Sequence, residues 1–225
     1  MRAHSMPRLV DLSHPISHGM VTYPGLPPPS IADHLTRQAS ASHYAPGTTF
    51  HISKVEMVAN TGTYVDAPSH RVEGAADIAG LPLERLAALD GVLFDATGRG
   101  GRAIGPELFA GPPLKGRAVL VRTGWSAHFG TEAYGRGHPF LTRAAAEHLL
   151  AAGAVLVGID SLNIDDTADG SRPVHTLLLR AGVPIVEHLR GLEQLPREGF
   201  QLHAVPAPFR GMSSFPVRAY AVLPD

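Results

Sequence analysis

The second half of the chain alternates short apolar runs with helical patterns, and this alternation limits the possible fold more than any other feature. Thr142 is a candidate helix N-cap, an apolar stripe follows it, and Gly153 is a stop signal. A second short helix is expected at 176–182. The expected buried strands cover residues 91–96, 118–122, 154–159 and 183–186. Strands that alternate with helices in this way predict an α/β domain with a mixed sheet.

Two of the expected strands lead directly into carboxylates. The strand at 154–159 is followed by Asp160, and the strand at 183–186 is followed by Glu187. In α/β sheets, ligands bind outside the carboxyl ends of the strands. We therefore expect Asp160 and Glu187 to lie near one pocket.

The first half of the chain is harder to interpret. Residues 9–13 and 50–58 have strand-like composition, and the stretch 26–47 is rich in proline, serine and histidine. We expect this stretch to form a long irregular surface loop, and a loop of that length is more often functional than inert. The loop and the aromatic residues Tyr23, Phe50, Trp125 and Phe215 are candidates for lining a pocket.

Composition excludes several classes of function. The 225 residues contain no cysteine, which rules out disulfides, thiolate-bound zinc and a cysteine nucleophile. The formal net charge is −1, so neither nucleic acid nor a membrane surface is an expected partner. No segment is long and apolar enough to span a bilayer. We expect a cytoplasmic protein with a single domain at 7–225 and a tail at 1–6.

Candidate site residues fall in two regions. Asp66 and His70 stand four residues apart in a segment that Pro68 interrupts, and His175 and Glu187 form a second pair. Spacing alone favours an ordinary turn, with Asp66 hydrogen-bonded to its own backbone and His70 on the surface. Together, two imidazoles and two carboxylates could hold a divalent ion such as zinc or manganese, or could supply general acid–base groups.

Several separated motifs, in matching order along nearly the whole chain, resemble the cyclase family that includes bacterial kynurenine formamidase and isatin hydrolase. They include Tyr23-Pro24-Gly25, Val65-Asp66-Ala67-Pro68, the run 120–125, Gly158-Ile159-Asp160 with Asp165, Pro173-Val174-His175 and Glu187. The resemblance implies a swivelling β/β/α fold with a mixed sheet. It also implies a homo-oligomer, either a homodimer or a homotetramer, that acts on a small-molecule substrate.

The family signature His-x-Gly-Thr-His-x-Asp-x-Pro-x-His is altered in this chain. Asn60 and Tyr64 stand where relatives have two metal-binding histidines. The resemblance implies Asp66, His175 and Glu187 as the remaining metal ligands, with Asn60 as a weak additional one, and His70 as the catalytic histidine. An asparagine carbonyl or a neutral phenol binds zinc far less well than imidazole. One site of a two-metal centre should therefore be lost, and both a single ion and a metal-free pocket remain open.

Three functions are compatible with these residues. The first is a hydrolase of an amide, lactam or ester bond in a small molecule, with His70 moving protons beside the metal. The second is a metal-independent cyclase, dehydratase or isomerase of a biosynthetic pathway in secondary metabolism. In it His70 and Glu187 form the acid–base pair, and Tyr64 donates a hydrogen bond to a developing oxyanion. The third is a non-catalytic ligand-binding protein.

Overall fold

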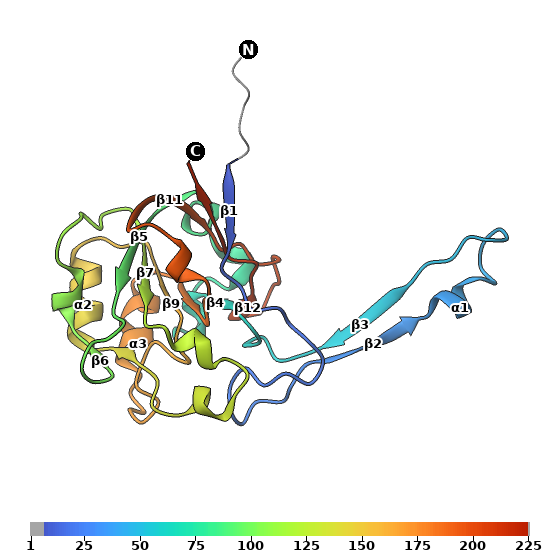
Figure 1. Ribbon diagram of the computed structural model, residues 1–225, viewed down its shortest axis with the longest axis horizontal. Coiled ribbons are helices and arrows are strands. Elements are labelled where there is room, and N and C mark those ends of the chain that lie inside the picture. The colour runs from blue at the N-terminus through green and yellow to red at the C-terminus, as the bar shows by residue number, and fades with distance from the viewer. Residues whose placement is uncertain (1–6, 225) are drawn as a thin grey trace, which may run out of the picture.

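The computed structural model describes residues 7–224, and its centre is a nine-stranded mixed sheet (Figure 1). Residues 1–6, which the sequence analysis sets aside as a tail, lie outside the described residues. The strands of this sheet are β1 (Arg8–Asp11), β4 (Tyr64–Asp66), β5 (Leu89–Asp95), β7 (Ala118–Arg122), β9 (Leu156–Ile159), β10 (Ile185–Glu187), β11 (Glu198–His203), β12 (Ser214–Pro216) and β13 (Tyr220–Leu223). Their order across the sheet is β1-β13-β11-β5-β7-β9-β10-β4-β12.

The four central strands, β5, β7, β9 and β10, run parallel to one another, and every other neighbouring pair is antiparallel. Their carboxyl ends therefore meet at one edge, as expected for this class of sheet. The prediction of a mixed α/β sheet is confirmed. The four strands expected at 91–96, 118–122, 154–159 and 183–186 correspond to these central strands within two residues at each end.

Two helices, α2 (Arg143–Ala151) and α3 (Pro173–Arg180), lie together on one face of the sheet (Figure 1). Apolar side chains such as Leu149 and Leu178 pack there against the parallel strands in one core. Thr142 caps α2 as predicted, because its hydroxyl accepts a hydrogen bond from the backbone N–H of Ala145 at 3.1 Å.

A second core fills the opposite face of the sheet. It joins side chains of the first and last strands, such as Val10 and Ala221, to Val65 and Val186 near the other end of the strand order. Ser13, just after β1, also forms an antiparallel bridge with Leu189, just after β10. Strands that are distant in the sheet order therefore meet in space, and the sheet is strongly curled.

The prediction of an irregular loop at 26–47 is wrong. This segment contains β2 (Ser30–Leu35) and a single-turn helix α1 (Arg37–Ser40), and β2 pairs with β3 (Ile52–Glu56) in an antiparallel ribbon. The ribbon and the residues 36–51 that join its two strands extend away from the body, and we call residues 30–56 the arm (Figure 1). Nearly all its side chains are exposed. Its backbone satisfies its hydrogen bonds by strand pairing alone, so the arm forms without the alternation of apolar residues that marks a packed strand.

A further small pair of strands, β6 (Ala103–Ile104) and β8 (Phe140–Leu141), lies beside the helices. Helix α3 begins at Pro173, three residues before the predicted start at 176. Its cap comes from a distant part of the sequence, because the Asp165 carboxylate accepts the backbone N–H groups of Val174 and His175 at 2.7 and 3.0 Å. Among residues 7–224, no helix combines the length and apolarity required to cross a membrane.

Gly158 on β9 lets the sheet pack tightly at its centre. A Cβ atom there would lie 2.6 Å from Leu120 Cδ2 and 2.8 Å from Leu189 Cδ1, and both leucines are fully buried. We predict that Gly158→Ala lowers the free energy of unfolding by about 1–3 kcal/mol through overpacking. Chemical denaturation monitored by circular dichroism measures this change. Gly100→Ala is the matched control, because a Cβ there meets open space, and equal effects of both variants would refute the packing explanation.

Candidate active site

Three neighbouring strands at one end of the sheet place polar side chains on a shared face. In the strand register, Glu187 of β10 lies opposite Tyr64 of β4, and Asp66 of β4 lies opposite Ser214 of β12. Because side chains alternate between the two faces of a strand, Tyr64 and Asp66 point to the same side, while Val65 between them enters the second core. All four polar residues are buried.

Helix α3 brings His175 to this face of the sheet. Its Nδ1 hydrogen-bonds to the Asp165 carboxylate at 2.7 Å, which leaves Nε2 to face the strands. Nε2 lies 3.6 Å from Asp66 Oδ2 and 3.6 Å from Glu187 Oε1. An imidazole nitrogen and two carboxylate oxygens therefore surround one small space inside the protein.

His70 lies at the more exposed side of the same group. It follows β4 in a short 3₁₀ turn (Pro68–His70), and part of its ring is exposed. The Ser214 hydroxyl donates to Asp66 Oδ1 and lies 3.2 Å from His70 Nδ1. Because the single hydroxyl hydrogen is used by Asp66, Ser214 accepts from Nδ1–H, and Nε2 of His70 is left able to take up a proton.

These groups line one cavity of about 370 Å³. All six residues that the sequence analysis selected lie in its wall, namely Asn60, Tyr64, Asp66, His70, His175 and Glu187. Tyr23 to Leu26 and Asn163 complete the lining. The two imidazoles and two carboxylates expected from the sequence, those of Asp66, His70, His175 and Glu187, therefore converge on one cavity. Their catalytic or metal-binding roles stay predictions.

The electrostatics of the cavity favour a positive charge at its centre. Burial lowers the pKa of the His175 imidazole, but the facing carboxylates, Glu187 first among them, outweigh burial and raise it to about 10. Burial raises the pKa of Glu187 above its usual range. Burial also acts to raise the pKa of Asp66, but the close approach of the His175 imidazole and the charge of His70 hold that pKa below the usual value.

The residues present fit a single divalent cation. Asp66 Oδ2 is buried and has no hydrogen-bond partner, which is costly for a carboxylate oxygen unless something else binds it. Asp66, His70 and His175 can each offer one ligand atom, all within 4.8 Å of one another. The Asp165–His175 hydrogen bond is the kind of support that metal-binding histidines normally have.

Tyr64, at one of the two altered signature positions, is arranged differently from a metal ligand. Tyr64 is fully buried, and its hydroxyl donates to Glu187 Oε2 at 2.6 Å. Burial raises the pKa of this phenol well above its usual value, and the charges of Glu187 and Asp66 add to the effect. Tyr64 is therefore a neutral hydrogen-bond donor to Glu187.

The expectation that Asp160 shares a pocket with Glu187 is wrong. Asp160 does not line the cavity. Its carboxylate accepts the backbone N–H groups of Thr123 and Gly124 at 2.6 and 2.9 Å, and so holds the turn after β7. Of the four aromatic candidates, only Tyr23 lines the cavity, since Phe50 packs on Tyr44 in the arm and Phe215 packs on Phe209.

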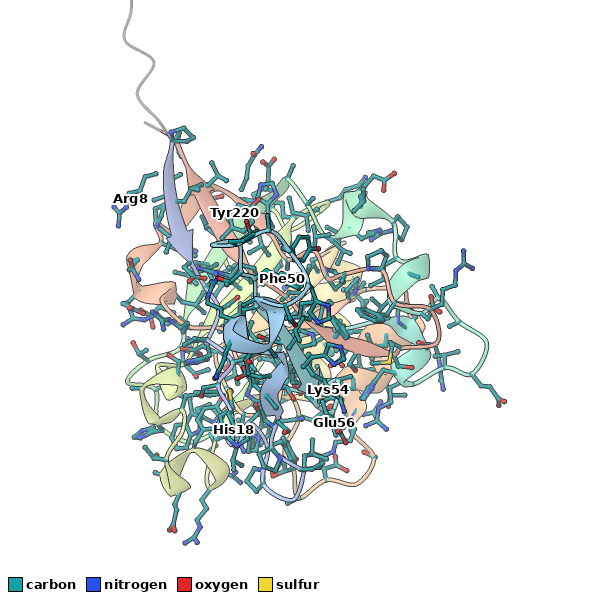
Figure 2. The ribbon with its side chains drawn as sticks, turned by 90° about the vertical axis from the view of Figure 1, so that its right-hand side faces the viewer. Arg8, His18, Phe50, Lys54, Glu56 and Tyr220 are labelled. Atoms are coloured by element: carbon teal, nitrogen blue, oxygen red, sulfur yellow. The ribbon has the colours of Figure 1, made fainter. Side chains whose placement is uncertain are left out.

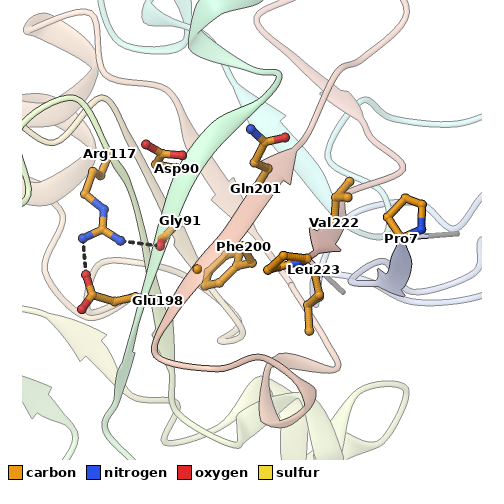
Figure 3. A pocket seen from close by; sticks show the side chains of 11 residues that line it. Pro7, Asp90, Gly91, Arg117, Glu198, Phe200, Gln201, Val222 and Leu223 are labelled. Carbon is orange, nitrogen blue, oxygen red and sulfur yellow. Dashed lines mark hydrogen bonds and ion pairs between the residues drawn. The ribbon is translucent and has the colours of Figure 1, made fainter. Parts of the chain in front are cut away.

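A larger cavity, of about 600 Å³, lies at the opposite end of the parallel strands (Figure 3). Arg117 crosses it, paired with Glu198 and hydrogen-bonded to the Gly91 carbonyl at 2.8 Å. The two terminal nitrogens of Arg117 are thus already paired, and the cavity lies at the amino ends of β5 and β7, away from the edge where α/β sheets bind ligands. The smaller cavity is the better candidate for an active site.

Three residues that support the site were not assigned a role from sequence. Asp165 orients His175, and Ser214 links Asp66 to His70. His188 contacts the Tyr64 hydroxyl through Nε2. The sequence analysis gives His188 no site role, yet it is fully buried. None of the three has a spacing that indicates ligation, because each acts through a side chain from another strand or helix.

Comparisons with known proteins agree with this fold. The model of the family described as "Putative cyclase" matches residues 10–166. The chain is 30% identical over 225 residues to a kynurenine formamidase of Paracidovorax citrulli, covering 95% of this chain and 96% of the relative. It is 27% identical to a kynurenine formamidase of Bacillus cytotoxicus, covering 93% and 95%.

Solved structures give the same result. One described as a potential metal-dependent hydrolase with cyclase activity has a TM-score of 0.80 and 28% identity, covering 98% of this chain and 100% of the other. Isatin hydrolase A from Labrenzia aggregata has a TM-score of 0.83 at 23% identity, covering 97% and 94%, which is a likeness of fold. The resemblance drawn from sequence, to a family of enzymes whose relatives are hydrolases, is confirmed. The chain belongs to the cyclase family.

Proposed function

We propose that this protein is a hydrolase of a small amide, lactam or ester that uses one divalent metal ion, zinc or manganese. The observation that carries the proposal is the buried, unpartnered Asp66 oxygen facing His175 and Glu187. Relatives named kynurenine formamidase support an amide as the substrate. The cavity of about 370 Å³ is large enough for a small-molecule amide.

Asp66, His175 and Glu187 would hold the ion. His175 offers Nε2, because its Nδ1 is used by Asp165, and each carboxylate offers an oxygen 3.6 Å from that nitrogen. Asn60 lines the same cavity and is a weak additional ligand. When bound, such an ion supplies Lewis-acid activation of the substrate carbonyl and of a water molecule.

The protein's own residues manage the protons. Nε2 of His70 is left free by the Ser214 contact to Nδ1, so it can take a proton from the attacking water and return it to the leaving group. Ser214 fixes the ring by donating to Asp66 and accepting from His70.

The arm supports assembly into a homodimer or homotetramer. It carries large apolar side chains that are exposed in the single chain: Ile31, Tyr44, Ile52 and Val55. Figure 2 looks at the arm end-on, with the body behind it, and labels Phe50, Lys54 and Glu56. Exposed apolar groups on a projecting ribbon are stabilised by burial against a partner, and a second copy of this chain is the proposed partner.

Metal dependence tests the central proposal. We predict that protein loaded with zinc and then dialysed retains about one ion per chain. Asp66→Asn should bind zinc at least roughly 100-fold more weakly, because an anionic ligand is replaced by a neutral one. Asp90→Asn, an exposed carboxylate in the distant cavity, is the control. Elemental analysis and calorimetric titration measure both quantities.

Activity is measured on the N-formyl amide of kynurenine and on isatin. Loss of turnover on chelation and its recovery with zinc would support the hydrolase. Turnover that survives complete chelation would instead favour the metal-independent cyclase, dehydratase or isomerase, and tight binding of both compounds without conversion would favour a ligand-binding protein.

The pH dependence of activity tests the role of His70. Burial lowers its pKa from the usual value of 6.5, and this effect exceeds the opposing influence of Asp66. Since a general base must be neutral, kcat/KM should fall as the pH falls through this pKa, and the acidic limb should lie below pH 6.5. His70→Gln should lower kcat by at least roughly 100-fold and abolish that limb. An acidic limb that is unchanged in the variant would exclude His70 as the base.

The arm makes a prediction about assembly. Val55 and Ile31 are cross-strand partners in the arm. We predict that Val55→Asp converts the oligomer to a species with the mass of a single chain, because a charge would be buried in the interface. Light scattering coupled to size-exclusion chromatography measures the mass. Ser53→Asp adds the same charge to the same strand without removing an apolar group, and it should leave more oligomer; a wild-type protein that is already monomeric contradicts the proposal.

A further inference from the structure

A line of four buried side chains runs from the interior of the protein to the candidate site. Tyr134 OH lies 2.8 Å from His188 Nδ1, His188 Nε2 lies 3.4 Å from Tyr64 OH, and Tyr64 OH lies 2.6 Å from Glu187 Oε2. All four side chains are buried. The sequence analysis connects only two of these residues, Tyr64 and Glu187, with the site.

The hydrogen-bond directions along this line follow from its last member. The Tyr64 hydroxyl has one hydrogen, which it donates to Glu187. Toward His188 the phenol oxygen can only accept, so Nε2 of His188 must carry the hydrogen. The neutral imidazole then has a bare Nδ1, which accepts the hydrogen bond from Tyr134. Each donor in the line is thus matched to one acceptor.

The backbone of His188 adds a second, independent observation. Its φ angle is 56°, in the left-handed region, where the other residues of the described chain with such angles are mostly glycine. Glycine or asparagine would adopt this conformation at lower cost than histidine. The Thr63 hydroxyl holds the strained unit in place by donating to the His188 carbonyl at 2.6 Å. A histidine therefore occupies a backbone position that glycine adopts more easily, and the feature it adds is an imidazole whose Nε2 lies 3.4 Å from the Tyr64 hydroxyl.

Glu187 is the residue that this line supports. Its Oε1 accepts the backbone N–H of Ile164 at 2.6 Å and lies 3.6 Å from His175 Nε2, while its Oε2 is occupied by Tyr64. The carboxylate is therefore fixed in the orientation that turns Oε1 toward the centre of the site. Without Tyr64, or without the His188 imidazole that contacts the Tyr64 hydroxyl, the Glu187 carboxylate could rotate away from His175.

We propose that His188 is a positioning residue, which donates from Nε2 to the Tyr64 hydroxyl and thereby holds Tyr64 on Glu187, with Tyr134 selecting the tautomer. Tyr64 then acts as a support of Glu187, and its hydroxyl hydrogen is not available for a substrate oxyanion. This inference rests on the proposed function, in which Glu187 orients toward a metal ion, and it assigns roles to two residues, His188 and Tyr134, that lie outside the cavity wall.

The tautomer of His188 is the first test, and it needs no activity. In ¹⁵N-labelled full-length protein at neutral pH, NMR correlation of ring nitrogens with ring protons identifies which nitrogen carries hydrogen, and loss of a signal in His188→Gln assigns it. The proposal predicts hydrogen on Nε2 and a bare Nδ1 whose resonance shifts in Tyr134→Phe. Hydrogen on Nδ1 would overturn the proposal, even if the protein proved to be a zinc-dependent hydrolase.

Substitutions at 188 give the second test. Glutamine places an amide donor near the position of Nε2, whereas leucine fills a similar volume without a donor. His188→Leu should weaken zinc binding and lower kcat by roughly tenfold with KM nearly unchanged, because a supporting hydrogen bond of a ligand is lost. His188→Gln should stay within about twofold of the wild type. Equal behaviour of the two variants would overturn the proposal in favour of a packing role.

Two further variants guard against misfolding and non-specific effects. His188→Asn suits the left-handed backbone, and its amide lies near Nδ1 and cannot reach Tyr64, so it should match His188→Leu in zinc binding. His203→Gln, a histidine on β11 stacked against Tyr220, should leave zinc binding unchanged. If no variant and no wild-type protein binds zinc, the proposed function fails, and the tautomer measurement alone decides the inference.

Discussion

The site depends on two buried carboxylates, Asp66 and Glu187, that face the same imidazole nitrogen of His175. Burying one unpaired carboxylate is costly, and burying two side by side is possible only when positive charge lies between them. In the protein alone that charge is a proton on His175, whose pKa the carboxylates raise to about 10. An arrangement that holds a proton so strongly also attracts a divalent cation. The same constraint therefore governs both stability and the proposed chemistry.

The fold satisfies this constraint by means of two different elements. The antiparallel pairing of β4 with β10 and β12 puts Tyr64, Asp66, Glu187 and Ser214 on one face. Helix α3 lies over the same face and places His175 against these side chains. Asp165 both caps the helix and holds the imidazole. A single carboxylate thus links the start of the helix to the orientation of the ring. At the two positions where the family resemblance implies histidines, the chain has Asn60 and Tyr64, and the Tyr64 hydroxyl donates a hydrogen bond to Glu187.

Much of the central sheet and of the site could be predicted from sequence, and the reasons are local. The runs at 118–122 and 154–159 are apolar because parallel strands are covered on both faces, and Thr142 and Gly153 mark helix ends through their own backbone chemistry. One strand of the arm, β3, lies within the stretch 50–58 that has strand-like composition, but β2 and the arm as a whole could not be predicted, because exposed strands lack a buried face and hence an apolar pattern. Asp165, Ser214 and His188 were missed since their roles come from contacts between residues far apart in the chain, such as Ser214 with Asp66. Asp160 was misassigned because the sequence shows that a carboxylate follows the strand but not which group it binds. That group is the backbone N–H of Thr123, which only the tertiary structure brings to Asp160.

The most direct test of the central claim is anomalous X-ray diffraction from crystals of the full chain grown with zinc, recorded on both sides of the zinc absorption edge. The account predicts one strong anomalous peak per chain, bounded by Asp66 Oδ2, His175 Nε2 and Glu187 Oε1, with Tyr64 still hydrogen-bonded to Glu187. A second peak beside Asn60 and Tyr64 would contradict the single-ion site. The absence of any peak near Asp66 at saturating zinc would contradict the account as a whole.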